Sequence, residues 1–317
     1  MIKSVFRKSS PRRNSNAKLN EQVEREGTFP PVPEQERAAY SGRMELIEKL
    51  RSGETIDEPI AVVVAHPDDE TVGIGSRLRR ITDLRLIHIT DGAPRGPANA
   101  QRAGFADWRA YAEAREQELA CALDVLGASG AARCAYGFPD QAAVFHVDEI
   151  AERLAHDLSS VAAVLSHPYE HGHPDHDSVA LAVSIACRLR EARGQMAPLR
   201  LEFASYHLAG APVFGRFRPH PLHPETAIEL TAPELAIKQA ALGCFASQAQ
   251  TLAPFPLSPE RLRVAPDYDF TCAPGAALYE HWGFEMTAEH WRNAAARALR
   301  QYANGDACTG GVQARAP

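Results

Sequence analysis

The hexapeptide AHPDDE at residues 65–70 constrains this chain most, because it places a histidine and three acidic residues directly after an apolar run. The run, residues 60–64, is rich in β-branched residues and bounded by prolines, which predicts a short buried strand. His66, Asp68 and Asp69 then emerge at the carboxyl end of this strand, where ligands bind in open α/β sheets. Because buried charges need a partner or a metal, the hexapeptide favours a metal site. The alternative is a turn whose aspartates only cap the following helix.

A second polar cluster, SHPYEHGHPDHD at residues 166–177, follows another apolar run, residues 161–165. It contains His173 and His176, and the apolar residues after it recur at helical spacing, so strand, polar turn and helix occur here again. Crossovers in α/β proteins bring the carboxyl ends of parallel strands to one edge of the sheet, so the two loops can share a site. Imidazole and carboxylate groups are ligands of Zn²⁺ and similar cations. The two loops together predict one metal site.

Apolar runs alternate with helical patterns along most of the chain. This alternation predicts an α/β fold with a Rossmann-like, doubly wound, mostly parallel sheet and helices on both faces. The predicted strands are residues 60–65, 84–90, 133–136, 161–166, 201–206 and 226–230. The predicted helices are residues 35–51, 71–80, 108–126, 147–158, 177–192 and 232–247. Residues 209–224, dense in proline, arginine and histidine, are predicted to form a long loop over the active-site edge.

The charge distribution divides the chain into a tail and a body. Residues 1–20 contain six basic and no acidic side chains, so the net charge of −6 becomes −12 for the rest of the chain when this +6 is subtracted. An acidic body disfavours nucleic-acid binding, and the basic tail is predicted to be disordered over residues 1–33. Residues 34–302 are predicted to form a single domain, and residues 303–317 a flexible tail. The sequence leaves the oligomeric state open.

Hydropathy and cysteine usage bear on the compartment. No apolar segment of the sequence is long enough to predict a transmembrane helix, and residues 1–30 lack the apolar stretch of a secretory signal. A cytoplasmic location is therefore expected. The six cysteines are dispersed and form no Cys-x-x-Cys pair, so they are expected to be separate thiols rather than a disulfide framework.

These motifs together resemble the zinc-dependent de-N-acetylases of the PIG-L or LmbE type. The resemblance rests on AHPDDE, on HPDH at residues 173–176, and on AREQELACALDVLG and GFPD in the segment that ends at residue 140, with a weaker match in KQAALGCFASQ at residues 238–248. Members of this family remove acetyl groups from N-acetylglucosaminyl lipids and from thiol-precursor glycosides. The resemblance therefore implies a zinc-dependent hydrolase whose partner is a small N-acetylated sugar or glycoconjugate, with another divalent metal such as Fe²⁺ as an alternative cofactor.

The resemblance also implies a role for each residue of the two loops. His66, Asp69 and His176 match the three protein ligands of the metal, which leaves a fourth position for water, as a catalytic site requires. Asp68 matches the general base. His173 matches the group that stabilises the oxyanion or protonates the departing amine. Asp175 would orient His173 and tune its charge.

Two residues outside the loops match positions that contact sugar hydroxyls in this family, namely Arg115 and Asp140. A guanidinium and a carboxylate suit such recognition. The alternatives are a surface ion pair with Glu116 or Glu118 for the arginine, and a turn residue for the aspartate.

His167, Glu170 and His171 lie in the second loop without an implied role, and His171 is expected to be a solvated loop residue.

Two other classes of function compete with a hydrolase. The first is a Rossmann-like nucleotide-binding module, which is supported by Gly73 and Gly75. However, the third glycine of that fingerprint is absent, and the preceding aspartates would repel a pyrophosphate. The second is a non-catalytic binding protein with a vestigial metal site. The presence of the complete set of catalytic residue types disfavours it, and metal content together with amide cleavage would separate the three hypotheses.

Overall fold

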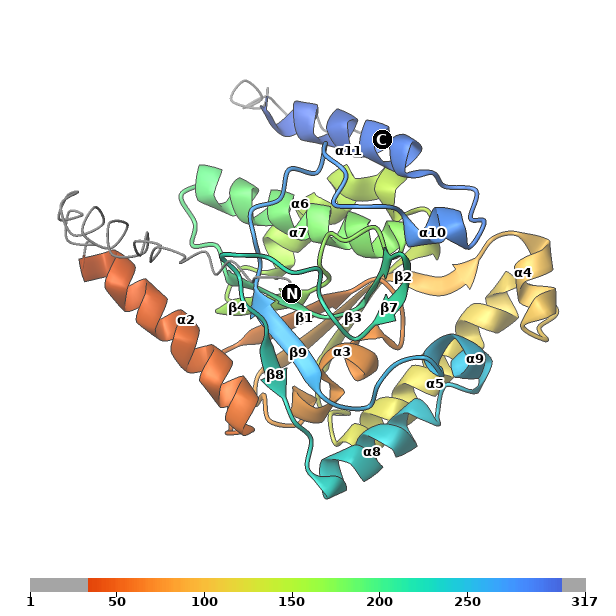
Figure 1. The fold of residues 1–317 in the computed structure, drawn as a ribbon, viewed down its shortest axis with the longest axis horizontal. Coiled ribbons are helices and arrows are strands. Elements are labelled where there is room, and N and C mark those ends of the chain that lie inside the picture. The colour runs from red at the N-terminus through yellow and green to blue at the C-terminus, as the bar shows by residue number, and fades with distance from the viewer. Residues whose placement is uncertain (1–33, 304–317) are drawn as a thin grey trace, which may run out of the picture. The chain divides into compact units, whose positions relative to one another are not determined.

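The computed structural model describes residues 34–303, and its core is a seven-stranded sheet with the strand order β3-β2-β1-β4-β5-β9-β8 (Figure 1). The predicted basic tail and all but Ala303 of the predicted C-terminal tail lie outside the described residues. The strands of this sheet are β1 (Ile60–Val64), β2 (Leu84–Pro94), β3 (Ala132–Asp140), β4 (Ala163–Ser166), β5 (Leu199–Phe203), β8 (Thr226–Ile228) and β9 (Glu260–Val264).

Strands β1 to β5 are parallel, which confirms the predicted mostly parallel sheet. The strand order reverses direction between β1 and β4, so the chain leaves these two neighbouring strands toward opposite faces of the sheet. In open α/β sheets this switch point is where a crevice forms at the carboxyl ends of the strands. The loops after β1 and β4 are the two loops of the predicted metal site.

Helices cover both faces of the sheet, as predicted, with α6, α7 and α11 on one side and α3, α5 and α8 on the other (Figure 1). The helices are α2 (Glu34–Ser52), α3 (Asp69–Leu78), α4 (Pro97–Arg102), α5 (Trp108–Leu126), α6 (Val147–Asp157), α7 (Pro174–Ala192), α8 (Ala232–Leu242), α9 (Ala249–Leu252), α10 (Leu278–His281) and α11 (Ala288–Ala303). Short 3₁₀ turns, η1 (Ala143–His146) and η2 (Ala246–Gln248), precede α6 and α9. No helix within residues 34–303 is long and apolar enough to cross a bilayer.

Strand β1 is apolar throughout because each of its faces enters a different core. Ala61 and Val63 pack into the core that contains α6 and α7, whereas Val62 and Val64 pack into the core that contains α3 and α5. All of these side chains are fully buried. A central parallel strand therefore carries a continuous apolar run rather than an alternating one. This burial fixes the end of β1, and with it the position of His66.

The C-terminal part of the sheet departs from the prediction. The strand predicted at residues 226–230 is β8, and it pairs antiparallel with β9, which no pattern in the sequence predicted. Strand β9 also pairs antiparallel with β5. The predicted loop at residues 209–224 is partly wrong, because β7 (Ala211–Phe214) pairs with β6 (Tyr206–Ala209) in a short hairpin.

The cysteine prediction is wrong at one pair. Cys121 on α5 and Cys244, just after α8, form a disulfide across a sequence separation of 123 residues. The spacing of cysteines does not reveal such a pairing, because connectivity depends on the packing of the two helices. Cys134, Cys187 and Cys272 are free thiols, as predicted.

Candidate metal centre and active site

The predicted metal-site residues lie together at the switch point of the sheet. His66 follows β1, and Asp69 begins α3. His173 caps the N-terminus of α7, where its Nδ1 accepts a hydrogen bond from the backbone N–H of Asp175 at 3.2 Å. Pro174 at the first position of α7 suits a helix start, because that position needs no N–H donor. His176 therefore stands on the first turn of α7, facing the loop that carries His66.

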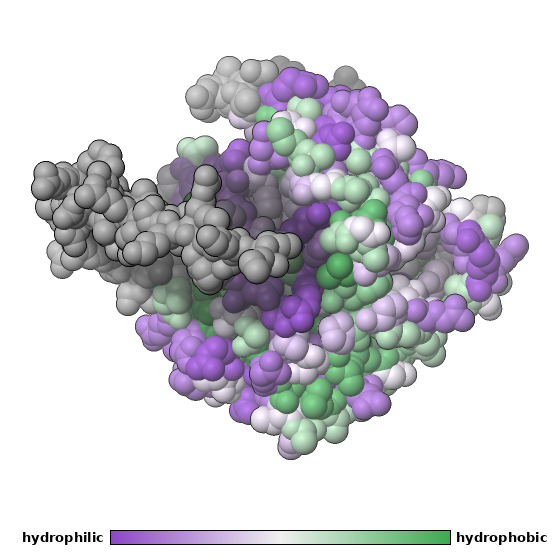
Figure 2. Space-filling view, in the orientation of Figure 1, coloured by the Kyte–Doolittle hydropathy of each residue, from purple (hydrophilic) through white to green (hydrophobic). Residues whose placement is uncertain are grey.

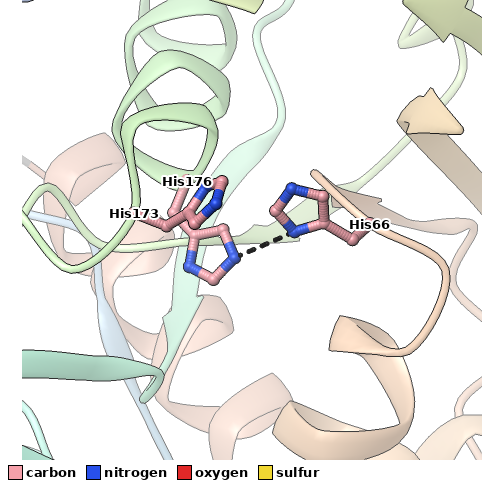
Figure 3. Close-up of side chains that lie close together, drawn as sticks. All are labelled: His66, His173 and His176. Carbon is pink, nitrogen blue, oxygen red and sulfur yellow. Dashed lines mark hydrogen bonds between the residues drawn. The ribbon is translucent and has the colours of Figure 1, made fainter. Parts of the chain in front are cut away.

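Two imidazole nitrogens and the two carboxylate oxygens of Asp69 lie close together. The Nδ1 atom of His66 lies 3.2 Å from Oδ2 of Asp69 and 3.3 Å from Nε2 of His176, and that Nε2 lies 3.2 Å from Oδ1 of Asp69. Figure 3 shows the imidazole rings of His66 and His176 approaching one another from the two loops. Ligands about 2.0–2.1 Å from a tetrahedral zinc ion stand roughly 3.3–3.4 Å apart. The spacings within the predicted ligand set are therefore those of ligands around one cation, with the two imidazoles facing different oxygens of Asp69.

The second nitrogen of His66 faces two carboxylates. Its Nε2 lies 3.3 Å from Oδ2 of Asp175 and 3.6 Å from Oδ1 of Asp140. Burial opposes protonation, but the neighbouring carboxylates raise the pKa of His66 well above its ordinary value. A carboxylate behind a histidine ligand fixes the orientation of the ring and strengthens the ligand. A site that concentrates negative charge in this way suits a cation.

The position of Asp175 differs from the expected one. Its carboxylate contacts His66 and accepts hydrogen bonds from the backbone N–H groups of Gln141 at 2.6 Å and Ala143 at 3.1 Å. Its contact with His173 is made through the backbone N–H instead. The carboxylate therefore orients the opposite histidine instead of His173, whereas its negative charge acts on His173 as expected and opposes the lowering of that residue's pKa. The reason is that the first turn of α7 points this side chain toward the end of β3.

Arg115 is buried rather than part of a surface ion pair, so the surface alternative is wrong. Its side chain is 3% exposed, and its guanidinium donates to Oδ2 of Asp68 at 2.9 Å and to the carbonyl oxygens of Pro67 and Gly92 at 3.2 Å. Burial raises the pKa of the Asp68 carboxyl to about 6, against the opposing effect of the Arg115 cation. The arginine thus fixes both the loop and the carboxylate next to Asp69.

His173 and Asp140 both line the cavity at the metal site. Burial, together with the neighbouring His66, lowers the pKa of His173 to about 3. The imidazole of His173 is therefore neutral at pH 7. The Oδ1 atom of Asp140 is buried and has no hydrogen-bond partner among the described residues, so the turn-residue interpretation does not account for it.

The second loop is buried, so the expectation of a solvated His171 is wrong. The His171 backbone carbonyl accepts from the N–H of Leu278 at 2.8 Å. The ring of His167 stacks on His176 with centroids 3.9 Å apart, and its Nε2 accepts from the backbone N–H of Ala65 at 3.0 Å. Glu170 accepts from the backbone N–H of Arg218 at 2.7 Å. These residues hold the loop in place, which loop composition alone could not predict.

The site opens into a cavity of about 610 Å³. Besides the metal-site residues, its lining contains polar side chains that the sequence analysis did not single out, among them Asn99, Arg102, Gln141 and Gln248. It also contains a group of aromatic side chains from the C-terminal half of the chain, Tyr206, Phe214, Phe255, Trp282 and Phe284. No local motif marks these residues, because they come from separate loops that only the fold brings together.

Comparison with known proteins finds similarity over the segment that contains this site. Residues 61–187 match the family model of PIG-L, described as GlcNAc-PI de-N-acetylase. A relative from Kineococcus radiotolerans, 1D-myo-inositol 2-acetamido-2-deoxy-alpha-D-glucopyranoside deacetylase, is 30% identical over 161 residues, which cover 40% of this chain and 45% of the relative. The chain therefore matches about half of that protein's length.

Two solved structures share the fold. One is a triple mutant of a deacetylase involved in the teicoplanin biosynthetic pathway, with a TM-score of 0.51 and 16% identity. The other is the zinc-inhibited form of teicoplanin deacetylase, with a TM-score of 0.50 and 14% identity. Each similarity covers 67% of this chain and 99% of the other chain. Residues 61–187, which contain both loops of the candidate metal site, are thus the part of this chain that is similar to the PIG-L family.

Proposed function

We propose that this chain is a metal-dependent hydrolase that removes the N-acetyl group from an N-acetylglucosamine-type glycoside or a related amide. The observation that carries the proposal is the close approach of His66 Nδ1, His176 Nε2 and the Asp69 carboxylate, all 3.2–3.3 Å apart, beside a cavity lined by Asp68 and His173. The names of the family model and of the Kineococcus radiotolerans relative both describe deacetylation of an acetylated glucosamine.

His66, Asp69 and His176 would hold the metal, which we propose to be Zn²⁺ or another divalent cation such as Fe²⁺. Two imidazole nitrogens and a carboxylate suit both ions. When bound, such a cation polarises the amide carbonyl and lowers the pKa of water to about 7. The remaining steps depend on side chains of the protein.

Asp68 is the proposed general base. It lines the cavity and adjoins Asp69 in the chain, while Arg115 holds one of its oxygens at 2.9 Å. With a pKa of about 6, this carboxylate is mostly ionised at pH 7 and accepts a proton more readily than an ordinary aspartate. It would take the proton of the attacking water and deliver it to the departing amine.

His173 is the proposed oxyanion donor rather than an acid. Because its Nδ1 accepts from the backbone N–H of Asp175, the single proton of the neutral ring lies on Nε2. A neutral Nε2–H group can donate to the oxygen that becomes negatively charged in the transition state. The low pKa of this ring disfavours a role as the proton donor at pH 7.

Asp140 is the proposed sugar-binding residue. Its buried Oδ1 lies 3.6 Å from Nε2 of His66 but accepts no hydrogen bond within the described residues, so it can accept one from a hydroxyl group of the substrate. Arg115 is placed to assist by fixing Asp68 and the adjoining loop, and it lines the same cavity.

The test is acetate release from a panel of N-acetylglucosaminides by the metal-loaded protein, with metal content measured on the same samples. Asp69→Ala should lose both metal and activity. Asp68→Asn keeps the shape of the side chain but removes the proton acceptor, so it should retain the metal and lose at least about 10²-fold in kcat.

Asp91→Asn is a suitable control, because Asp91 pairs with Arg95 at 2.6 Å and does not line the cavity. It should retain both metal and turnover. A protein with full metal occupancy that releases no acetate from any glycoside or simple acetamide would instead be a binding protein with a vestigial site.

A further inference from the structure

We propose that the cavity contains a separate subsite for an aromatic or similarly flat apolar group carried by the substrate beyond its N-acetylated sugar. This inference rests on the proposed function and extends it to the class of substrate. The subsite is an aromatic wall, defined by the cavity-lining side chains of Tyr206, Phe214, Phe255, Trp282 and Phe284.

The aromatic wall begins at the reacting centre. The ring of Tyr206 lies 5.2 Å from that of His176, and the ring of Phe284 lies 5.3 Å from that of His173. Trp282 lies a further 5.6 Å from Tyr206 and is 42% exposed. The wall therefore extends two ring-to-ring steps from a metal ligand to the outside. A single sugar bound at the metal site would leave the outer rings of the aromatic wall uncovered.

The rings also pack against one another. Phe255 lies 5.6 Å from Tyr206 and 5.1 Å from Phe214, and Phe214 stacks on Trp282 at 6.5 Å. Edge-to-face and stacked contacts of this kind fix the ring planes. The wall thus presents a continuous aromatic surface rather than isolated side chains.

Backbone contacts hold the segments that carry the wall. A Cβ atom on Gly172 would overlap the carbonyl oxygen of Tyr206, so this glycine lets the metal-site loop and β6 touch. A Cβ atom on Gly215, at the end of β7, would lie 2.6 Å from Pro256, next to Phe255 in the chain. These close contacts order the subsite in advance, which reduces the entropy cost of binding.

The C-terminal segment is fixed to the same loop. The backbone N–H of Leu278 donates to the carbonyl of His171 at 2.8 Å. The indole N–H of Trp291 on α11 donates to the carbonyl of Pro174 at 3.0 Å. Trp282 and Phe284 lie between these two anchors in the chain, so their segment is held at both ends.

The rest of the cavity lining is largely polar, with Asp68, Asn99, Arg115, Asp140 and Gln141 near the metal site. A cavity with polar and aromatic parts suits a substrate that has both a hydroxyl-rich part and a flat apolar part. Figure 2 shows hydrophobic surface next to strongly hydrophilic surface on the face where β7 lies in Figure 1. Apolar surface that continues into a reacting centre marks a ligand-binding site.

All five residues of the aromatic wall lie outside residues 61–187, the segment that matches the PIG-L model. The proposed metal ligands, the base and the oxyanion donor all lie inside it. The aromatic wall therefore lies in the part of the chain that the PIG-L family model does not match. This division suits a specificity element added to a common catalytic centre.

The experiment compares kcat/KM for phenyl and methyl N-acetylglucosaminides, with both anomers of each, using the metal-loaded full chain. Covering a phenyl ring should favour the phenyl glycoside by at least about tenfold. Trp282→Ala should reduce this ratio to below about threefold, whereas Trp282→Phe should keep most of it. Phe145→Ala is the control, because Phe145 is 62% exposed and does not line this cavity, so the ratio should not change.

Three results would contradict the proposal in different ways. Equal kcat/KM for the phenyl and methyl glycosides would overturn the subsite while leaving the deacetylase intact. An equal loss on both glycosides in Trp282→Ala would also overturn it and would assign the ring to stacking on the sugar itself. If no glycoside releases acetate, the proposed function fails, and calorimetric binding of the same glycosides then tests the subsite alone. Tighter binding of the phenyl glycoside that is lost in Trp282→Ala would support the subsite. Equal binding of the phenyl and methyl glycosides would overturn it.

Discussion

At the scale of single residues, the site depends on which atom of each side chain faces which neighbour. His66 turns Nδ1 toward Asp69 and Nε2 toward Asp175, so one ring can serve as a ligand and be oriented from behind. Arg115 donates a hydrogen bond to Oδ2 of Asp68 at 2.9 Å, which fixes the orientation of this carboxylate beside Asp69, the proposed metal ligand. The residue types could be predicted from the motifs, but the pairing of these atoms could not.

The pairing of Arg115 with Asp68 predicts a change in the pH dependence of activity. Asp68 must be ionised to act as a base, so kcat/KM should fall as the pH drops through its pKa, which burial raises to about 6. The Arg115 cation lowers this pKa. In Arg115→Met the acidic limb of the profile should therefore move to higher pH, and in Arg115→Lys it should move less.

The measurement is the pH profile of kcat/KM for the metal-loaded variants. An acidic limb at the same pH in wild type and Arg115→Met would mean that the arginine does not tune the base.

At the scale of elements, α3 is positioned by its contact with the sheet. A Cβ atom on Gly73 would overlap the ring of Phe203 at the end of β5, and one on Gly75 would touch Leu126 on α5 at 3.6 Å. Packing thus accounts for Gly73, one of the two glycines that supported a nucleotide-binding module, whereas a methyl group at Gly75 would make an ordinary van der Waals contact. Because α3 begins at Asp69, the packing of this helix against the sheet also fixes the position of Asp69, a proposed metal ligand.

Gly73→Ala should destabilise the protein by about 1–3 kcal/mol, because the added methyl group forces either α3 or the Phe203 ring to move. Gly130→Ala is the matched control, since a Cβ atom there would have no neighbour within 4 Å. Urea unfolding of both variants measures the difference. Equal stability of the two variants would show that α3 and β5 are not in close contact at this glycine.

At the scale of the whole molecule, a buried ion pair joins the antiparallel extension of the sheet to the helices of the parallel part. Nζ of Lys238 on α8 lies 2.7 Å from Oε1 of Glu260 on β9, and both residues are at most 3% exposed. The lysine also donates to the carbonyl of Val72 on α3 at 2.7 Å, and Glu260 accepts from the backbone N–H of Ser76 at 3.1 Å. Three elements therefore meet at one pair of charges.

Lys238→Met should cost about 3–5 kcal/mol of unfolding free energy, because it leaves the Glu260 carboxylate buried without its cation. Adding Glu260→Gln should recover part of this loss, since the amide oxygen can still accept from Ser76. Chemical denaturation of the single and double variants provides the comparison. A double variant no more stable than Lys238→Met would mean that the cost comes from lost packing rather than from the unpaired charge.

Local patterns were sufficient to predict many of the elements and the residues of the candidate site. The apolar run of β1, the helical spacing after His173 and the two histidine and carboxylate loops are properties of neighbouring residues, and each indicates its structure directly. The meeting of these two loops at one edge of the sheet was also predicted, because crossovers bring the carboxyl ends of parallel strands to the same edge.

Other features arise from contacts between distant parts of the chain. The disulfide between Cys121 and Cys244, the antiparallel strand β9 and the aromatic wall join residues that are distant in the chain. Their individual sequence neighbourhoods are ordinary, and no local preference distinguishes them from other helix, strand or loop residues. The free energy that stabilises such contacts comes from the simultaneous packing of many elements, so it cannot be inferred from any one stretch of the sequence.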